Sequence, residues 1–173
     1  EFLYLNKLNT VISYPKNRIN VLLLENVHPV AVQLMKAEGF NVETYAAAMT
    51  EDELCEKIKN VNVLGIRSKT QVTKKVLENA NRLMSIGAFC IGTNQIDLKE
   101  ATKKGVAVFN APFSNTRSVV ELAIAQMIML MRNIVDKSEK MHHGKWDKSA
   151  KGSYEVRGKH LGLIGYGNIG TQL

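Results

Sequence analysis

The chain has 173 residues, of which 45% are hydrophobic and 23% charged, and its formal net charge is +7 with a pI near 9.4. This composition is typical of a soluble globular protein, and the length allows one domain, or one domain and part of another. No segment resembles a secretory signal, and the longest apolar stretch, residues 119–131, is too short to span a bilayer. We therefore expect a cytoplasmic protein without a membrane partner.

The charge pattern argues against a nucleic-acid-binding protein, and the cysteines argue against a metal site or a disulfide-rich protein. Lys and Arg are scattered without interleaved aromatics, so a solvated basic surface or a small anionic substrate is favoured over nucleic acid. Two cysteines, Cys55 and Cys90, fit neither a metal site nor a disulfide framework, and we expect both to be reduced and partly buried.

The first half of the chain alternates short apolar runs with helix signals. Residues 1–18 show no sustained pattern and are interpreted as an arm. Pro29 and Gly39 delimit one predicted helix, and Thr50 and Glu53 form a capping box for the next. The predicted strands are 19–24, 41–45 and 61–66, and the predicted helices are 29–38 and 51–58.

The same alternation continues to residue 109. Thr73 and Asp97 are predicted helix caps, and Gly105 is a predicted helix stop. The remaining predicted strands are 83–86 and 106–109. Strands that alternate with helices of this length predict right-handed crossovers and a doubly wound parallel sheet. Ligands of such sheets bind at the carboxyl ends of the strands, here the loops 25–28, 67–70, 87–96 and 110–117.

A long helix and a connection follow. Ser118 and Glu121 predict a helix that runs to about Met141 and is apolar around most of its circumference, so we expect it to be buried between layers. Its methionines, Met127, Met129, Met131 and Met141, are interpreted as core residues. His142 and His143 begin a polar connection, residues 142–158, and are interpreted as linker residues.

The chain ends on a glycine-rich pattern. Residues 161–164 predict a buried strand, and Gly165, Gly167 and Gly170 follow in the order G-x-G-x-x-G before an apolar continuation suited to a helix. This order is typical of a turn at which a helix N-terminus meets a dinucleotide pyrophosphate. A purely structural turn is the alternative. The position about 20 residues later, where an acidic residue would strengthen the pattern, falls beyond Leu173, and we expect the chain to be a fragment.

Several stretches together resemble the D-2-hydroxyacid dehydrogenase family, most closely its members that oxidise D-3-phosphoglycerate. They are I-R-S-K-T (66–70), I-G-T-N-Q-I-D (91–97), F-N-A-P-F-S-N-T-R-S-V-V-E-L (109–122), H-G-K-W (143–146) and G-K-H-L-G-L-I-G-Y-G-N-I-G-T-Q-L (158–173). The resemblance implies a flavodoxin-like, doubly wound substrate-binding domain followed by the truncated start of a Rossmann NAD-binding domain. The implied boundaries are an arm at 1–18, a substrate-binding domain at 19–114 and the start of the NAD-binding domain at 115–173.

The resemblance also implies site residues. Arg67, Ser68, Lys69 and Asn115 match substrate-contacting positions, and Lys148 matches a basic position that reaches substrate phosphate from a neighbouring subunit. Lys69 stands where close relatives often have Arg, which exchanges a bidentate contact for a point charge. Without the resemblance, Arg67 and Lys69 would be interpreted as a solvated loop tip, and Asn115 as turn chemistry.

The cofactor and assembly follow in the same way. Gly165, Gly167, Asn168, Ile169 and Gly170 match positions against the NAD pyrophosphate. The segment around Trp146 matches one used for dimer contacts, so a homodimer or homotetramer is expected. No metal is expected.

The implied activity is NAD-dependent oxidation of D-3-phosphoglycerate, a small phosphorylated hydroxy acid, in the first step of serine biosynthesis. The family's catalytic His, Glu and Arg lie beyond this chain, so we expect the chain alone to be inactive. Three alternatives remain open: oxidation of another D-2-hydroxy acid, a non-enzymatic NAD-sensing corepressor on the same fold, and a methyltransferase-like nucleotide fold.

Overall fold

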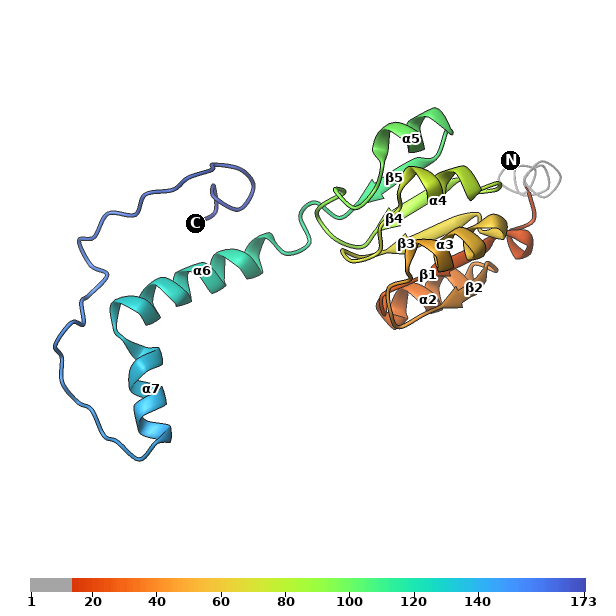
Figure 1. Ribbon diagram of the computed structural model, residues 1–173. Helices are drawn as coiled ribbons and strands as arrows, with labels where there is room; N and C mark the ends of the chain where they lie inside the picture. The colour runs from red at the N-terminus through yellow and green to blue at the C-terminus, as the bar shows by residue number, and fades with distance from the viewer. Residues whose placement is uncertain (1–13) are drawn as a thin grey trace, which may run out of the picture. The chain divides into compact units, whose positions relative to one another are not determined.

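The computed structural model describes residues 14–173 and divides the chain into two units (Figure 1). The first extends to Pro112, and the second comprises Phe113–Leu173. Most of the predicted arm, residues 1–13, lies outside the described residues. The elements of the first unit are η1 (Lys16–Arg18), β1 (Asn20–Leu23), α2 (Pro29–Ala37), β2 (Asn41–Thr44), α3 (Glu51–Lys57), η2 (Ile58–Asn60), β3 (Val63–Ile66), α4 (Lys74–Asn79), β4 (Ser85–Ala88), α5 (Leu98–Lys103) and β5 (Ala107–Asn110).

The five strands form one parallel sheet in the order β2-β1-β3-β4-β5. Val21 of β1 pairs with Val42 of β2 on one side and with Val63 of β3 on the other. The predicted flavodoxin-like, doubly wound sheet is therefore confirmed. Because the chain passes from β1 to β2 on one side and then to β3 on the other, the strand order reverses at β1. In open α/β sheets, the carboxyl ends of the strands at such a reversal form the ligand-binding crevice.

Local signals in the sequence set the helix ends of this unit. The Thr50 hydroxyl accepts a hydrogen bond from the Glu53 amide at 3.4 Å, and the Glu53 carboxylate accepts one from the Thr50 amide at 2.8 Å. Pro29 occupies the first position of α2, and Gly39 follows that helix with φ +89°. The predicted capping box, proline start and glycine stop are confirmed, because each depends only on neighbouring residues.

Alternating strand residues divide the core between the two faces of the sheet. Leu22 and Leu64 pack with residues of α3, α4 and α5 in one cluster. Val21 and Leu23 pack with α2 residues in a second cluster. Helices thus pack on both faces of the sheet, α3, α4 and α5 on one face and α2, over β1 to β3, on the other.

One predicted strand is displaced. The apolar run predicted a strand at 83–86, but β4 comprises Ser85–Ala88. Gly87 and Ala88 continue the ladder opposite Gly65 and Ile66, whereas Leu83 is buried in the core before the strand begins. The apolar run therefore predicted correctly that Leu83 is buried. The bounds of the strand depend instead on which residues pair with β3.

The predicted long helix is two helices, α6 (Thr116–Met131) and α7 (Ile134–His142), with a visible bend between them (Figure 1). Asn133 adopts a left-handed backbone with φ 52°, and its side-chain amide donates to the Gly152 carbonyl at 2.8 Å. Asparagine tolerates this conformation, which ends a helix. The predicted cap at Ser118 is also wrong, because Asn115 precedes the first helical residue, Thr116.

The expected burial of this helix is not found in the structure. Leu122 and Leu130 are 58% and 74% exposed, and only Thr116 and Val120 of the second unit are buried. The methionines are not core residues either: Met129 and Met141 are exposed, and Met127 and Met131 line a groove. Among residues 113–173 the structure has no strand against which an apolar helix could pack.

The predicted strand at 161–164 is not formed, and neither is the helix after Gly167. Leu161 and Leu163 are 56% and 42% exposed. A strand requires a hydrogen-bonded neighbour, which residues 113–173 do not supply, and a helix of a few residues does not repay its nucleation.

Across residues 14–173, no single helix is long and apolar enough to cross a membrane; α6 and α7 meet that test only as a pair, across a bend of 71°.

Candidate anion-binding site

Three loops meet at the carboxyl edge of the sheet, where β1, β3 and β4 end. The Leu24 amide donates to the Gly65 carbonyl at 2.8 Å, and the Phe89 amide donates to the Ile66 carbonyl at 2.8 Å. These bonds continue the ladder one residue beyond the strands. The loops after these strands, residues 25–28, 67–70 and 89–96, therefore begin side by side at the point where the strand order reverses.

Glu25 links the first of these loops to the second. Its side chain is buried, with only 7% of the residue exposed, and it crosses from the end of β1 to the loop after β3. Its carboxylate accepts hydrogen bonds from the amides of Arg67 at 3.1 Å, Lys69 at 3.0 Å and Thr70 at 2.8 Å. A concave run of backbone amides is an anion-binding arrangement, and here a carboxylate of the protein itself fills it.

The environment of Glu25 favours its charged form. Burial raises the pKa of the carboxyl group, but the hydrogen bonds that it accepts from the amides of Thr70, Lys69 and Arg67 lower it, and the net effect is a pKa below the ordinary value. The group is therefore an ionised carboxylate at neutral pH, because hydrogen bonds that favour the charged form outweigh the desolvation.

Gln95 holds the same loop from the side of β4. It is 4% exposed, and its amide nitrogen donates to the Arg67 carbonyl at 2.8 Å and to the Gly92 carbonyl at 3.2 Å. The half-buried Cys90 thiol lies in the same network, 3.2 Å from the Gly92 carbonyl. The backbone of Arg67 is thus held on both sides: its N–H donates to Glu25, and its carbonyl accepts from Gln95.

This backbone presents three exposed side chains, those of Arg67, Ser68 and Lys69. Within residues 14–173, no ion pair involves Arg67 or Lys69. Two cations on a fixed loop suit an anion with more than one charge, since a guanidinium binds a carboxylate or phosphate through paired hydrogen bonds.

The other two predicted substrate residues belong to the second unit. Asn115 is exposed and precedes α6, and its carbonyl accepts from the Val119 amide at 3.0 Å. Lys148 is exposed in the irregular segment after α7, two residues beyond Trp146, which is 73% exposed. The structure brings Arg67, Ser68 and Lys69 together on one loop and describes Asn115 and Lys148 within their own unit.

The glycine-rich loop forms a compact turn. Gly165 has φ +100°, and a Cβ at Gly170 would lie 2.5 Å from the Gly165 carbonyl oxygen, so both positions require glycine. Gly167 has open space around it, and its carbonyl accepts from the Thr171 amide at 2.9 Å across Asn168, Ile169 and Gly170. The Gly167 backbone is open to solvent, and the predicted helix N-terminus that would supply donors to a phosphate is not formed.

The two adjacent histidines are helix-end residues rather than linker residues. His142 is the last residue of α7 and His143 follows it. Their ring Nδ1 atoms lie 2.7 Å from the Ser138 carbonyl and 2.9 Å from the Glu139 carbonyl. Each ring nitrogen thus lies against a carbonyl one turn back in α7, and the Glu139 carbonyl also accepts from the His143 amide at 3.1 Å.

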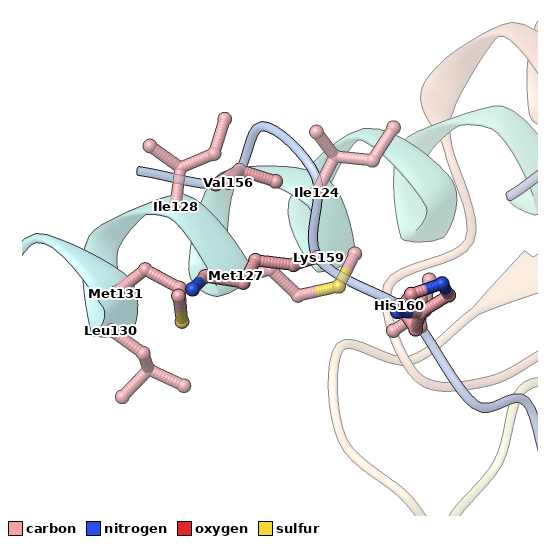
Figure 2. A pocket seen from close by; sticks show the side chains of 9 residues that line it. Ile124, Met127, Ile128, Leu130, Met131, Val156, Lys159 and His160 are labelled. Atoms are coloured by element: carbon pink, nitrogen blue, oxygen red, sulfur yellow. The ribbon is translucent and has the colours of Figure 1, made fainter. Parts of the chain in front are cut away.

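An apolar groove lies within the second unit, between α6 and the segment 156–161 (Figure 2). Ile124, Met127 and Ile128 line it from the helix, and Val156 faces them. Lys159 and His160 are the polar residues of its lining. The groove has no paired cations of the kind found on the loop after β3, so it is not the candidate anion site.

Comparison with known proteins decides the family. Residues 21–167 match the model of the D-isomer specific 2-hydroxyacid dehydrogenase catalytic domain. The chain belongs to this family. The matched range contains the predicted substrate residues Arg67, Ser68, Lys69, Asn115 and Lys148, and it ends within the glycine loop.

Curated relatives give a narrower comparison. The chain is 53% identical over 161 residues to the D-3-phosphoglycerate dehydrogenase of Dictyostelium discoideum, an alignment that covers 93% of this chain and 40% of the relative. It is 56% identical over 155 residues to D-3-phosphoglycerate dehydrogenase 2 of Saccharomyces cerevisiae, with 90% of this chain and 33% of the relative covered. The chain thus spans about two fifths of the first relative's length and a third of the second's.

Solved structures support the fold. The TT0316 protein of Thermus thermophilus superposes with a TM-score of 0.82 at 23% identity, over 88% of this chain and 50% of that one. D-Lactate dehydrogenase of Aquifex aeolicus, solved with NAD and lactic acid, gives a TM-score of 0.74 at 23% identity. The match covers 88% of this chain and 46% of that one. At these identities the likeness is one of fold alone.

Two residues of the candidate site were not predicted. Glu25 was visible only as an acidic residue directly after a buried strand, and Gln95 as one polar residue within a loop. Both were inside loops that the strand-end rule selected, but which backbone groups they bind depends on contacts 28 to 45 residues apart in the chain.

Proposed function

We propose that the complete protein containing this chain oxidises D-3-phosphoglycerate to 3-phosphohydroxypyruvate with NAD, in serine biosynthesis. The observation that carries the proposal is the pair of exposed cations, Arg67 and Lys69, on a loop fixed at the switch point of the sheet. Membership of the family and the names of the relatives at 53% and 56% identity support the same reaction.

The two cations have different roles in this proposal. Arg67 offers a planar guanidinium that binds one anionic group of the substrate through paired hydrogen bonds, and Lys69 adds a point charge beside it. Ser68 supplies a hydroxyl between them, and Asn115 a further polar contact. Lys148 is proposed to reach the phosphate of a substrate bound by a neighbouring subunit.

The glycine loop is the proposed cofactor site. Gly165 and Gly170 allow a turn that other residues would obstruct, and Gly167, Asn168 and Ile169 form the surface that would face the pyrophosphate. NAD, when bound, would supply the acceptor for the hydride from C2, and a base would take the hydroxyl proton. No residue of this chain is assigned that proton, and we propose that the chain alone is inactive.

Assembly and location complete the proposal. Trp146 is 73% exposed, and an exposed tryptophan is typical of a residue buried by a partner. We propose a homodimer or homotetramer with contacts near Trp146, in the cytoplasm.

A comparison of substrates tests the reaction. NADH formation by the complete protein is measured with 3-phosphoglycerate, glycerate, lactate and 2-hydroxyglutarate. We expect kcat/KM to be highest for 3-phosphoglycerate, and the isolated chain to produce no NADH. Activity only with an unphosphorylated acid would be consistent with the family but would contradict 3-phosphoglycerate as the substrate. NADH binding without turnover of any of them would favour the corepressor.

A further inference from the structure

We propose that Glu25 is a positioning residue for substrate binding, whose buried carboxylate holds the Arg67–Lys69 loop in its binding shape before the substrate arrives. The inference rests on the proposed function, because it concerns how the same loop meets the same anion. It assigns a role to a residue that touches neither substrate nor cofactor in that proposal.

The first support is the convergence of donors on one group. Oε1 of Glu25 accepts from the amides of Arg67 and Thr70, and Oε2 accepts from the amide of Lys69. Backbone amides that converge in this way bind anions. Because the anion is part of the protein, the loop is ordered without a ligand, and the free energy of binding is not spent on ordering it.

The second support is the backbone of the first loop. Glu25 and Asn26 have φ values of +60° and +53°, a conformation that costs free energy in residues other than glycine. It is held by hydrogen bonds from the Glu25 amide to the Ala47 carbonyl and from the Asn26 amide to the Tyr45 carbonyl, both 3.2 Å. These two consecutive left-handed residues follow Leu24, one residue beyond β1, and the Glu25 carboxylate meets the loop after β3.

The third support is the choice of partners. The carboxylate bonds to amides, and no ion pair in the described part of the chain joins it to the Arg67 guanidinium or the Lys69 ammonium. Glu25 therefore fixes the backbone while the two cations remain exposed. Gln95 completes the arrangement by bonding the Arg67 carbonyl at 2.8 Å.

Positioning and simple electrostatics predict opposite results for Glu25→Gln. Removing a negative charge near two cations would by itself strengthen the attraction of an anion and lower KM. Loss of positioning raises KM, since the glutamine oxygen can accept from Arg67 and Thr70 but its NH2 group faces the Lys69 amide, and two donors cannot bond. The sign of the change in KM distinguishes the two effects.

The test uses the complete enzyme at 25 °C with four variants: E25Q, R67A, the double variant E25Q/R67A and the control E38Q. Glu38 is an exposed glutamate of the same unit that pairs with Lys16. We expect E25Q to raise KM for 3-phosphoglycerate about tenfold, which corresponds to one charge-assisted hydrogen bond, with kcat and KM for NAD within about twofold. In the R67A background the same substitution should raise KM by a smaller factor than in the wild type, because only the Lys69 side chain remains to be positioned. E38Q should match the wild type.

Three outcomes would overturn the inference, and they are distinguishable. Wild-type enzyme that does not oxidise 3-phosphoglycerate overturns the proposed function and this inference with it. If R67A raises KM but E25Q leaves it unchanged or lowers it, the proposed function stands and the positioning role is wrong. An equal effect of E25Q with and without Arg67 assigns Glu25 a general structural role. If E25Q does not fold, Glu25→Asp replaces it, because aspartate keeps the charge but is shorter. The same two comparisons then apply: the change in KM, and that change with and without Arg67.

Discussion

The two units differ in how far their apolar segments are buried. In the first, β3 places Leu64 and Ile66 in a core where neither is exposed, whereas in the second, the apolar helix α6 leaves Leu130 74% exposed. Both segments are apolar in sequence. The difference is that β3 has a strand on each side and helices over it, and residues 113–173 contain no sheet. Apolar sequence becomes a core only where the topology supplies partners.

A pair of leucine substitutions should show the largest contrast between the units. Leu64→Ala removes a fully buried side chain and should lower the free energy of unfolding by about 2–5 kcal/mol, through lost transfer free energy and the cavity left behind. Leu130→Ala should change it by less than about 0.5 kcal/mol, since that side chain is already in water. Urea unfolding followed by far-UV circular dichroism measures both. If the two substitutions lowered the free energy of unfolding by similar amounts, the difference in burial between the two units would be contradicted.

Two carboxylates provide a smaller contrast that depends on pH. Glu25 has a lowered pKa and is buried, so its ionised form stabilises the fold above pH 4.5, its ordinary pKa, and this contribution disappears as the pH falls through the folded-state value. We expect Glu25→Gln to cost about 1–3 kcal/mol at pH 7 and progressively less below pH 4.5.

Asp147 in the second unit is the matched control. Its pKa is also lowered, by the hydrogen bond from Lys140 and then by the Ser149 amide, but the pair is at the surface. Asp147→Asn should give no resolvable change between about pH 3 and pH 7, because exposed pairs contribute little. Denaturant unfolding across that pH range, with wild type beside both variants, makes the comparison. A pH dependence of Asp147→Asn as large as that of Glu25→Gln would contradict it.

Helix caps should give the smallest contrast. Thr50→Ala removes the capping box of α3 and should cost about 1 kcal/mol. Asn115→Ala at the start of α6 should cost almost nothing, as the Asn115 side chain makes no capping hydrogen bond. Thermal unfolding of both variants measures the difference, and a larger loss for Asn115→Ala would show that α6 is held by a contact at its start.

The same contrast explains what the sequence could predict. Caps and stops such as Thr50, Pro29 and Gly39 depend on residues within one turn, and they were predicted correctly. The parallel sheet followed from the alternation of strands and helices. The end of α6 was missed because Asn133 breaks the helix through a bond to Gly152, far along the chain. The strand at 161–164 was wrong because its sequence specifies apolar character, whereas a strand also requires a neighbour.

The candidate site was predictable to the level of loops. The strand-end rule selected residues 67–70, and the family resemblance assigned roles to Arg67, Ser68 and Lys69, which stay predictions. Glu25 and Gln95 bind the backbone of this loop. Whether they can reach it depends on which loops the strand order places side by side. That order is a property of the whole fold, so no local pattern reveals it.

The most direct test of the account is the role of Arg67 in the complete enzyme. KM and kcat for 3-phosphoglycerate are measured for Arg67→Ala beside Arg82→Ala, an exposed arginine that precedes β4 at the opposite edge of the sheet. We predict that kcat/KM falls about a hundredfold for Arg67→Ala, as expected for loss of a charged contact to the substrate, and stays within about twofold for Arg82→Ala. Equal effects of the two substitutions would contradict the assignment of the loop after β3 as the substrate site.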